Sequence, residues 1–455
     1  MWKFNRVRNL THNESPIMNR RSFLGRTAAA AVLAPQSFQL LKAQAKGANE
    51  RLNVAFVGVG NKGAHAINSL ERLNLINMVA FADVDDATAA ATYKKHPGVP
   101  RFRDFRKMLD RHDSEIDAVV ISTPDHTHHY IAKWCLQMGK HVYLEKPLAH
   151  SIKECRDLAA VEKETGLVCQ MGNQGHSGSG IALLEAWYKA GVLGEVTEAI
   201  AWNKGDGNNP SATRPPAESV PSTLDWDLWL GPAREVPYSR QYVPKIWRWW
   251  YAFGNGSIGD WACHNMDAAY HVLGLNCPSS VKIRSTGPSK LSFPTSCEVA
   301  YRFPVAGGKE VSLKWYTGSA FGPKRPAELE ADRQLGSNGG GTLIIGTKAT
   351  VMMNSHAGSP RIIPESLNKE LAAELTRVEK RSNHFTNWIL SCKGEETPRS
   401  HFGYSARITE AMQYGKIALK VNRDLEIDPV ERKILGDREA TRLMSGPAPR
   451  KGWKI

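Results

Sequence analysis

The chain has 455 residues, of which 42% are hydrophobic and 23% are charged, an ordinary globular composition with room for two domains. The formal net charge is +14, but residues 1–45 carry +6 of it and the rest is scattered, which argues against a nucleic-acid partner. Beyond residue 45, no apolar run is long enough to span a membrane.

The first 45 residues have the form of an export leader. Asn19-Arg-Arg-Ser-Phe-Leu-Gly25 has the pattern of a twin-arginine signal, and an alanine-rich segment follows it. Ala43-Gln-Ala45 then offers a small-x-small cleavage site. We therefore expect a periplasmic or otherwise exported protein. The alternative is a basic leader that is never removed.

Residues 51–173 predict an α/β domain in which strands alternate with helices. The expected strands are 54–57, 78–82, 116–122, 141–144 and 167–171, with a short segment of unassigned type at 99–102. One helix is expected to begin at 64, and four more are expected at 86–95, at 104–110, from after 129 to 139, and at 151–165. This rhythm is typical of a doubly wound parallel sheet of the Rossmann type, whose ligand crevice lies at the carboxyl ends of the strands.

Gly58, Gly60 and Gly63 follow the first strand in G-x-G-x-x-G spacing. Such glycines allow a tight turn, close approach to a pyrophosphate and close helix–strand packing. The pyrophosphate would lie at the helix N-terminus, where free N–H groups favour an anion. Asn61 and Lys62 complete this predicted cofactor-binding loop. The alternative is a glycine-rich loop that binds no nucleotide.

Asp83 ends the second expected strand, twenty positions after Gly63. An acid at this position accepts hydrogen bonds from the adenosine ribose hydroxyls, and its charge repels a 2′-phosphate. The sequence therefore predicts NAD as cofactor rather than NADP.

Residues 174–430 predict a second, α+β domain with a large, open and mainly antiparallel sheet. After a helix at 180–190, the strand-like runs are 196–202, 281–285, 297–303, 310–315, 341–345 and 350–353; later helices are expected at 384–392 and 406–420. Residues 204–250 form an insertion rich in Pro, Gly and Trp, and irregular stretches of that length are usually functional. Residues 431–455 are interpreted as a C-terminal tail.

Lys146 follows a strand that points into the predicted crevice. A lysine there can hydrogen-bond a substrate hydroxyl and assist its deprotonation while a hydride leaves the carbon. The alternative is a surface turn with a salt-bridged lysine.

Asp260 and His264 are four residues apart and would share one face of a helix, with Asp267 nearby. A histidine held by a carboxylate can shuttle protons near neutral pH. The alternatives are a core histidine or a metal site, but no second His or Cys pair supports a metal, and we predict none. The seven cysteines show no paired spacing and are interpreted as buried thiols.

Together these residues resemble the Gfo/Idh/MocA oxidoreductases, the family of glucose–fructose oxidoreductase and the inositol dehydrogenases. The resemblance runs from about residue 52 to 270. It implies that the glycines and Asp83 bind NAD and that Lys146, Asp260 and His264 form the catalytic set. It also implies a group of residues beside the nicotinamide, namely Thr123, Asp125, His128 and Glu145. The segment 172–177 and the length of the insertion depart from the family pattern, and both bear on the substrate.

The substrate candidates lie around these departures. Arg248 and Trp249 belong to the aromatic insertion, and flat aromatic faces stack on sugar rings while polar groups read hydroxyls. His176 and Asp267 are further substrate candidates, and Asn173 is a further cofactor candidate. The alternative is that the tryptophans pack the insertion or a subunit interface.

Export favours NAD that stays bound and chemistry that is redox-neutral overall. The first hypothesis is an exported oxidoreductase for a sugar, polyol or glycoside, with hydride transfer assisted by Lys146 and His264. The second is an NAD-dependent glycoside hydrolase, which oxidises its substrate transiently at carbon-3, eliminates the glycosidic group and reduces the ring again. A third is a non-catalytic sugar-binding protein. The resemblance also suggests a homo-oligomer, a dimer or tetramer, formed through the open sheet.

Overall fold

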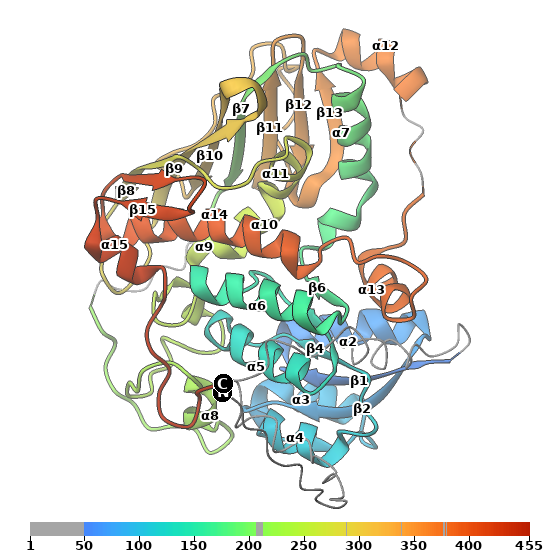
Figure 1. Ribbon diagram of the computed structural model, residues 1–455, viewed down its shortest axis with the longest axis vertical. Coiled ribbons are helices and arrows are strands. Elements are labelled where there is room, and N and C mark those ends of the chain that lie inside the picture. The colour runs from blue at the N-terminus through green and yellow to red at the C-terminus, as the bar shows by residue number, and fades with distance from the viewer. Residues whose placement is uncertain (1–49, 206–212, 288, 338, 376–377, 379) are drawn as a thin grey trace, which may run out of the picture. The chain divides into compact units, whose positions relative to one another are not determined.

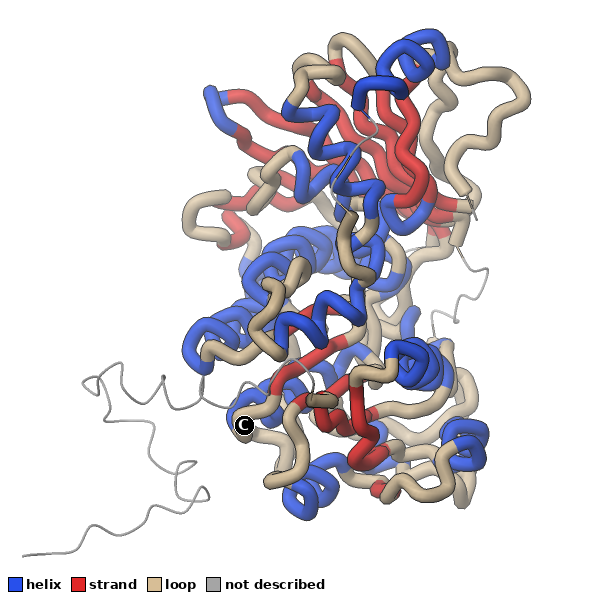
Figure 2. Tube along the Cα trace, turned by 90° about the vertical axis from the view of Figure 1, so that its right-hand side faces the viewer, coloured by secondary structure: helices blue, strands red, loops and turns tan. Residues whose placement is uncertain are grey.

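The computed structural model describes residues 50–205, 213–287, 289–337, 339–375, 378 and 380–455. The predicted signal peptide, residues 1–45, lies outside these ranges. Figure 1 shows two sheets, and Figure 2 shows that a layer of helices separates them. None of the described helices is long and apolar enough to cross a membrane.

The first sheet has six parallel strands in the order β3-β2-β1-β4-β5-β6. They are β1 (Leu52–Val57), β2 (Ile76–Ala82), β3 (Arg101–Phe102), β4 (Ala118–Ile121), β5 (His141–Leu144) and β6 (Cys169–Met171). The order reverses between β1 and β4, which is the switch point where doubly wound sheets bind ligands. The predicted Rossmann sheet is confirmed.

Helices cover both faces of this sheet because the strands are apolar on both sides. They are α2 (Asn61–Leu73), α3 (Asp86–Lys95), α4 (Phe105–His112), α5 (Asp125–Gln137), α6 (Ile152–Thr165) and, from much later in the chain, α13 (His384–Cys392). Phe385 and Trp388 of α13 pack into the same core cluster as Val54 of β1. A helix that begins 211 residues after the end of the domain (384 − 173) therefore completes its core, at a distance that local periodicity does not reveal.

The second sheet has nine strands in the order β13-β12-β11-β7-β10-β9-β8-β14-β15. They are β7 (Val196–Asn203), β8 (Ser280–Thr286), β9 (Ser296–Val305), β10 (Lys309–Thr317), β11 (Gly340–Gly346), β12 (Thr350–Asn354), β13 (Gly358–Ile363), β14 (Leu425–Asp428) and β15 (Lys433–Leu435). Within the described part of this second sheet, only β7 and β10 pair in parallel, so the sheet is mainly antiparallel, as predicted.

The remaining helices lie around and between the sheets (Figure 1). They are α7 (Ser179–Lys189), α8 (Trp226–Leu230), α9 (Gly256–Asp260), α10 (Ala262–Asn265), α11 (Asp267–Val272), α12 (Glu365–Leu375), α14 (Phe402–Val421) and α15 (Arg438–Leu443), with single 3-10 turns η2 (Gln174–Ser177), η3 (Ile246–Trp249), η4 (Ala306–Gly308) and η5 (Ser355–Ala357). The segment interpreted as a tail thus contains β15 and α15.

α14 joins the two sheets into one hydrophobic core. It packs on α6 from the first domain and on β8 from the second. Its Glu410 is only 2% exposed and accepts a hydrogen bond from Arg156 of α6 at 2.6 Å. A buried carboxylate needs such partners, and this pair fixes the helix to the Rossmann domain.

Two features of composition are explained by packing. All seven cysteines are buried free thiols, as predicted. Most of the aromatic residues of the insertion form their own core cluster, made of Leu224, Trp229, Leu230, Ala233, Tyr238, Tyr242, Trp247, Trp250 and Phe253. Burial of these rings gives an irregular stretch the apolar contacts that it needs to hold a fixed shape.

Candidate active site

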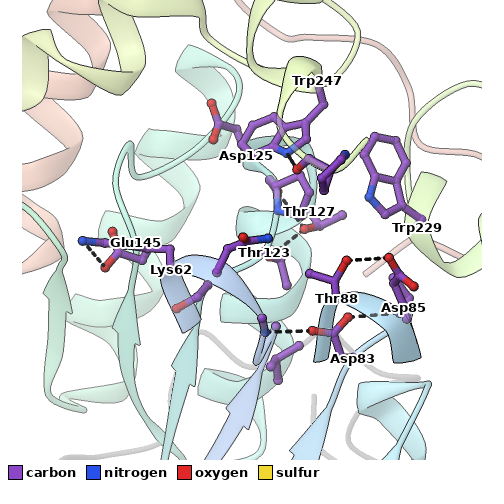
Figure 3. Close-up of a pocket in the computed structure, with 18 of the residues that line it drawn as sticks. Lys62, Asp83, Asp85, Thr88, Thr123, Asp125, Thr127, Glu145, Trp229 and Trp247 are labelled. Carbon is purple, nitrogen blue, oxygen red and sulfur yellow. Dashed lines mark hydrogen bonds and ion pairs between the residues drawn. The ribbon is translucent and has the colours of Figure 1, made fainter. Parts of the chain in front are cut away.

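A cavity of about 490 Å³ opens at the carboxyl ends of β1, β2, β4 and β5. Its other wall comes from the insertion, α9, α10 and η5. Most of the residues predicted for the site line this cavity: Gly58, Gly60, Asn61, Lys62, Asp83, Thr123, Asp125, Glu145, Lys146, Arg248, Trp249, Asp260 and His264. In Figure 3, Lys62 and Glu145 lie at one side, and Asp83, Asp85 and Thr88 at the other.

The glycine loop has no room for side chains. Gly58 has φ +78°, and a Cβ there would lie 2.7 Å from the carbonyl oxygen of Ser122. A Cβ at Gly63 would lie 1.9 Å from the carbonyl oxygen of Gly58. Gly63 does not line the cavity; it lets the first turn of α2 pack on the loop, the close helix–strand packing that its spacing predicted.

Asp83 holds the same loop from the end of β2. Its Oδ2 accepts hydrogen bonds from the backbone N–H groups of Val59 (2.8 Å) and Gly60 (3.3 Å), and its Oδ1 accepts one from Asp85 (3.0 Å). Burial raises the pKa of Asp83, while these three donors oppose the rise. The carboxyl group therefore shapes the phosphate loop and lines the cavity.

The residues present fit a bound dinucleotide. No side chain caps the N-terminus of α2 and its first turn has no acid, so its N–H groups are available to an anion. Lys62 supplies a cation there, with its Nζ 3.8 Å from Glu145 Oε1. Two buried oxygen atoms around the cavity, Ser122 Oγ and Glu145 Oε2, have no hydrogen-bond partner among the described residues. Such groups usually await a ligand or water.

Lys146 and Asp260 form a tight pair at the cavity wall. Lys146 Nζ donates to Asp260 Oδ1 (2.5 Å) and to its carbonyl oxygen (2.6 Å), and Arg248 Nε donates to the same carboxylate (3.3 Å). Burial lowers the pKa of Lys146, but Asp260 outweighs it and the pKa lies above 10.5. Burial raises the pKa of Asp260, but Lys146 and Arg248 hold it below its usual range. Lys146 is therefore a hydrogen-bond donor, not a base, at neutral pH.

His264 does not form the expected pair with Asp260. The helix breaks at Trp261, between α9 and α10, so the two side chains do not share one helical face, and Asp260 contacts Lys146 instead. Burial, followed by the charge of Lys146, holds the pKa of His264 well below 6.5. Its Nδ1 is buried and has no hydrogen-bond partner in the part of the chain that the structure describes. His264 is a neutral imidazole that can accept a proton.

The Thr123–Asp125 turn closes the floor of the site. The backbone N–H and the Nδ2 of Asn255 both donate to Asp125 Oδ2, at 3.0 and 2.8 Å. Burial raises the pKa of Asp125. His128 does not line the cavity; its ring nitrogens lie 2.8 Å from the carbonyl oxygens of Pro147 and Thr123, so it ties this turn to the loop that carries Lys146.

Three predicted residues lie elsewhere. His176 Nδ1 is 2.9 Å from Asp267 Oδ2, and Tyr404 Oη donates to Asp267 Oδ1 (2.5 Å), in a buried cluster that does not line the cavity. Asn173 is fully buried and its Oδ1 accepts a hydrogen bond from Ser400. The structure thus gives these polar residues partners within the protein interior.

The cavity also contains residues that sequence patterns did not single out. His356 comes from η5 and Trp453 from the C-terminal segment, and no motif marks either position. Trp229 and Trp247 belong to the aromatic insertion, and the high density of aromatic residues there was the only sequence signal for these two positions. Figure 3 shows both rings at the rim of the cavity.

Two family models match the chain. Residues 52–173 match the NAD-binding Rossmann fold of the Gfo/Idh/MocA oxidoreductase family, and residues 204–303 match a C-terminal alpha/beta domain of that family. Residues 52–173 are therefore an NAD-binding Rossmann domain, and the two matches support a Gfo/Idh/MocA family oxidoreductase.

Curated relatives match over about a third of the chain. The chain is 32% identical over 157 residues to a glycosyl hydrolase family 109 protein of Phocaeicola vulgatus, covering 32% of this chain and 37% of that protein. It is 28% identical over 161 residues to an alpha-N-acetylgalactosaminidase of Shewanella oneidensis, covering 33% and 35%. The chain spans little more than a third of the length of these relatives.

Solved structures share the fold over most of the chain. A WlbA dehydrogenase from Bordetella pertussis, in complex with NADH and UDP-GlcNAcA, has a TM-score of 0.59 at 15% identity and covers 84% of this chain and 99% of its own. A levoglucosan dehydrogenase in complex with NADH has a TM-score of 0.56 at 16% identity and covers 83% and 100%.

Proposed function

We propose that this protein is a Gfo/Idh/MocA family enzyme that oxidises a secondary alcohol of a sugar, polyol or glycoside with NAD. The observation that carries the proposal is the Lys146–Asp260 pair beside the neutral His264, all at the crevice where a Rossmann sheet binds its ligand. The family match of residues 52–173 supports the cofactor.

Each group has a distinct role in this reaction. Lys146 donates a hydrogen bond to the substrate hydroxyl and stabilises the oxygen as negative charge develops on it. His264 takes the hydroxyl proton, because it is neutral at working pH. Asp260 holds Lys146 in place and keeps it charged. NAD, when bound, supplies the hydride acceptor.

The wall opposite the glycine loop suits a carbohydrate. Arg248 Cζ lies 4.3 Å from the ring centroid of Trp247, and its Nε and Nη1 donate to Asp260 and to the carbonyl oxygen of Lys245. The guanidinium is therefore fixed, and its Nη2, which has no partner among the described residues, can meet a hydroxyl. Trp249 lies beside it. Flat rings and fixed polar groups are the usual means of recognising sugar rings.

The second candidate is an NAD-dependent glycoside hydrolase. It is favoured by the match of about a third of the chain to a glycosyl hydrolase family 109 protein and to an alpha-N-acetylgalactosaminidase. In that case the oxidation is transient, and the products are a free sugar and an alcohol.

One experiment separates the two. Full-length protein is purified without added cofactor, denatured to identify the released nucleotide, and tested natively on free sugars and para-nitrophenyl glycosides. Bound NAD that free sugars reduce supports the oxidoreductase. Bound NAD with release of the aglycone and no net NADH supports the hydrolase. The absence of both nucleotide and turnover would contradict both.

We also propose that the protein is exported, from the motif Asn19–Gly25. Replacement of Arg20 and Arg21 by lysine should retain the protein in the cytoplasmic fraction. Equal distribution of both forms on cell fractionation would contradict export by this route.

A further inference from the structure

His356 lies in η5, the turn between β12 and β13, and lines the same cavity as His264. The two imidazole rings are stacked, with centroids 4.1 Å apart and planes inclined by 28°. His264 is buried, whereas His356 is exposed. The site therefore presents two imidazoles side by side, one inside and one toward solvent.

The backbone of His356 is strained. Its φ is +61°, and those of Ala357 and Ser359 are +55° and +44°. Residues with a Cβ rarely adopt this left-handed region, and three of them within four positions persist only where the surroundings enforce the conformation. Strain of this kind concentrates at functional sites.

The residue next to His264 enforces it. Asn265 Oδ1 accepts hydrogen bonds from the backbone N–H of His356 (3.1 Å) and from Ser355 Oγ (3.0 Å). Ser355 Oγ also lies 2.9 Å from His356 Nδ1. On the other side, a Cβ at Gly175 would lie 2.3 Å from the carbonyl oxygen of His356, so η2 packs directly against the turn. The segment His264–Asn265 thus carries one imidazole and, through the side chain of Asn265, fixes the backbone of the turn that carries the other.

We propose that His356 is a second base, which removes the proton from the carbon next to the carbonyl that hydride transfer creates. The proposal rests on the proposed function, because that C–H bond becomes acidic only after oxidation. Hydride transfer from an alcohol needs one base, and His264 serves it. A second imidazole 4.1 Å away can reach the neighbouring position on the same sugar ring.

The groups around His356 leave it ready to accept a proton. Desolvation of the ring inside the cavity, followed by the charges of Lys146 and Lys62, lowers the pKa of His356, and Asp260 opposes them. His264, stacked on it, is neutral as well. Since His356 is exposed, its proton exchanges with water.

This role for His356 belongs to the second candidate function, in which the substrate is a glycoside whose leaving group lies on the carbon next to the deprotonated one. The C–H electron pair becomes a C=C bond, and the C–O bond pair leaves with the glycosidic oxygen, which takes a proton. Water then adds across the double bond, and return of the hydride restores the alcohol. The sum is hydrolysis of the glycoside, with no net oxidant.

The test uses the full-length, NAD-loaded enzyme with para-nitrophenyl glycosides in deuterated water. Three quantities are followed: reduction of bound NAD in one turnover, release of the aglycone, and deuterium in the sugar product by mass spectrometry. The variants are His356→Gln and His356→Gly; glycine suits the positive φ and so protects the fold. His401→Gln, on an exposed histidine outside the cavity, is the matched control.

We expect both His356 variants to lower deuterium uptake and aglycone release by about 100-fold or more, and by at least about 30-fold more than they lower the rate of NAD reduction. Added imidazole should partly restore deuterium uptake and aglycone release in His356→Gly. Wild-type enzyme that reduces NAD without deuterium uptake would overturn the role of His356 and leave the hydride-transfer function standing. Equal slowing of all three steps would make His356 a structural residue. A wild type that never reduces NAD would overturn the proposed function itself.

Discussion

Lys146 Nζ lies 2.5 Å from Asp260 Oδ1, and this pair links the end of β5 to the end of α9 across the cavity. Removing the carboxylate would leave Lys146 and Arg248 facing each other without a counter-ion. We expect Asp260→Asn to lower the free energy of unfolding by about 3 kcal/mol, measured by urea denaturation. Lys189→Met, which breaks an exposed pair with Glu185, should cost under about 1 kcal/mol.

The same pair sets a pH dependence of stability. The folded pKa of Asp260 is depressed, so its contribution is present above about pH 3.8 and is lost as the pH falls through the folded value. The folded pKa of Lys146 is raised, so its contribution is complete below pH 10.5 and is lost above that. The difference in unfolding free energy between wild type and Asp260→Asn should therefore be constant near neutral pH and shrink in acid. A difference that grows in acid would contradict the ion pair.

The pH profile of activity should report His264. Its pKa lies well below 6.5, so the neutral base persists as the pH falls through that value. We expect the acid limb of kcat/KM to lie below pH 6.5, without a basic limb from Lys146 below about pH 10. A limb centred above pH 6.5 would mean that another group, or a charged His264, controls the reaction.

Gly63→Ala should destabilise the first domain. Alanine is favoured over glycine in a helix by about 0.5–1 kcal/mol. Here the Cβ would lie 1.9 Å from a backbone oxygen. The resulting overpacking should cost about 2–3 kcal/mol or more, which exceeds the gain in helix propensity. Gly98→Ala is the control, since nothing lies within 4 Å of that Cβ. Differential scanning calorimetry should show a lower Tm for Gly63→Ala and an unchanged Tm for Gly98→Ala.

Asp83→Asn tests the preference for NAD over NADP. The amide oxygen still accepts from Val59 and Gly60, so the glycine loop keeps its acceptor, but the negative charge is gone and the NH2 group in place of Oδ1 no longer accepts from Asp85 N–H. We expect the ratio of the Kd values for NADP and NAD to fall by at least about tenfold in titration calorimetry. Asp83→Ala should in addition weaken both cofactors, because the loop loses its acceptor. An unchanged ratio in Asp83→Asn would mean that the charge of Asp83 does not determine the preference for NAD over NADP.

Local patterns predicted the parts of the site that depend on one strand and its next turn. Gly58 and Asp83 each follow a buried strand, and parallel topology brings strand ends to one edge of the sheet. Lys146 follows β5 for the same reason. These residues line one cavity because the register of the sheet places them there.

The remainder depends on contacts that no local pattern carries. The i, i+4 spacing of Asp260 and His264 implied one helical face, but the break at Trp261 turned Asp260 toward Lys146. His356 reaches the cavity only because β11 and β12 pair beside β7. Polar residues such as Asp267 satisfy one another in the interior, and their sequence spacing resembles that of a site.

The most direct test of the central claim is single-turnover reduction of bound NAD in a stopped-flow instrument, with a substrate that carries hydrogen or deuterium on the carbinol carbon. We predict that deuterium slows the reduction in the wild type. We also predict that Lys146→Met lowers its rate by about 100-fold or more while the Kd for NAD stays unchanged. A Lys146→Met enzyme that reduces NAD at the wild-type rate would contradict the assigned site. If the wild-type enzyme binds NAD but no sugar, polyol or glycoside reduces the bound NAD, the proposed function is contradicted.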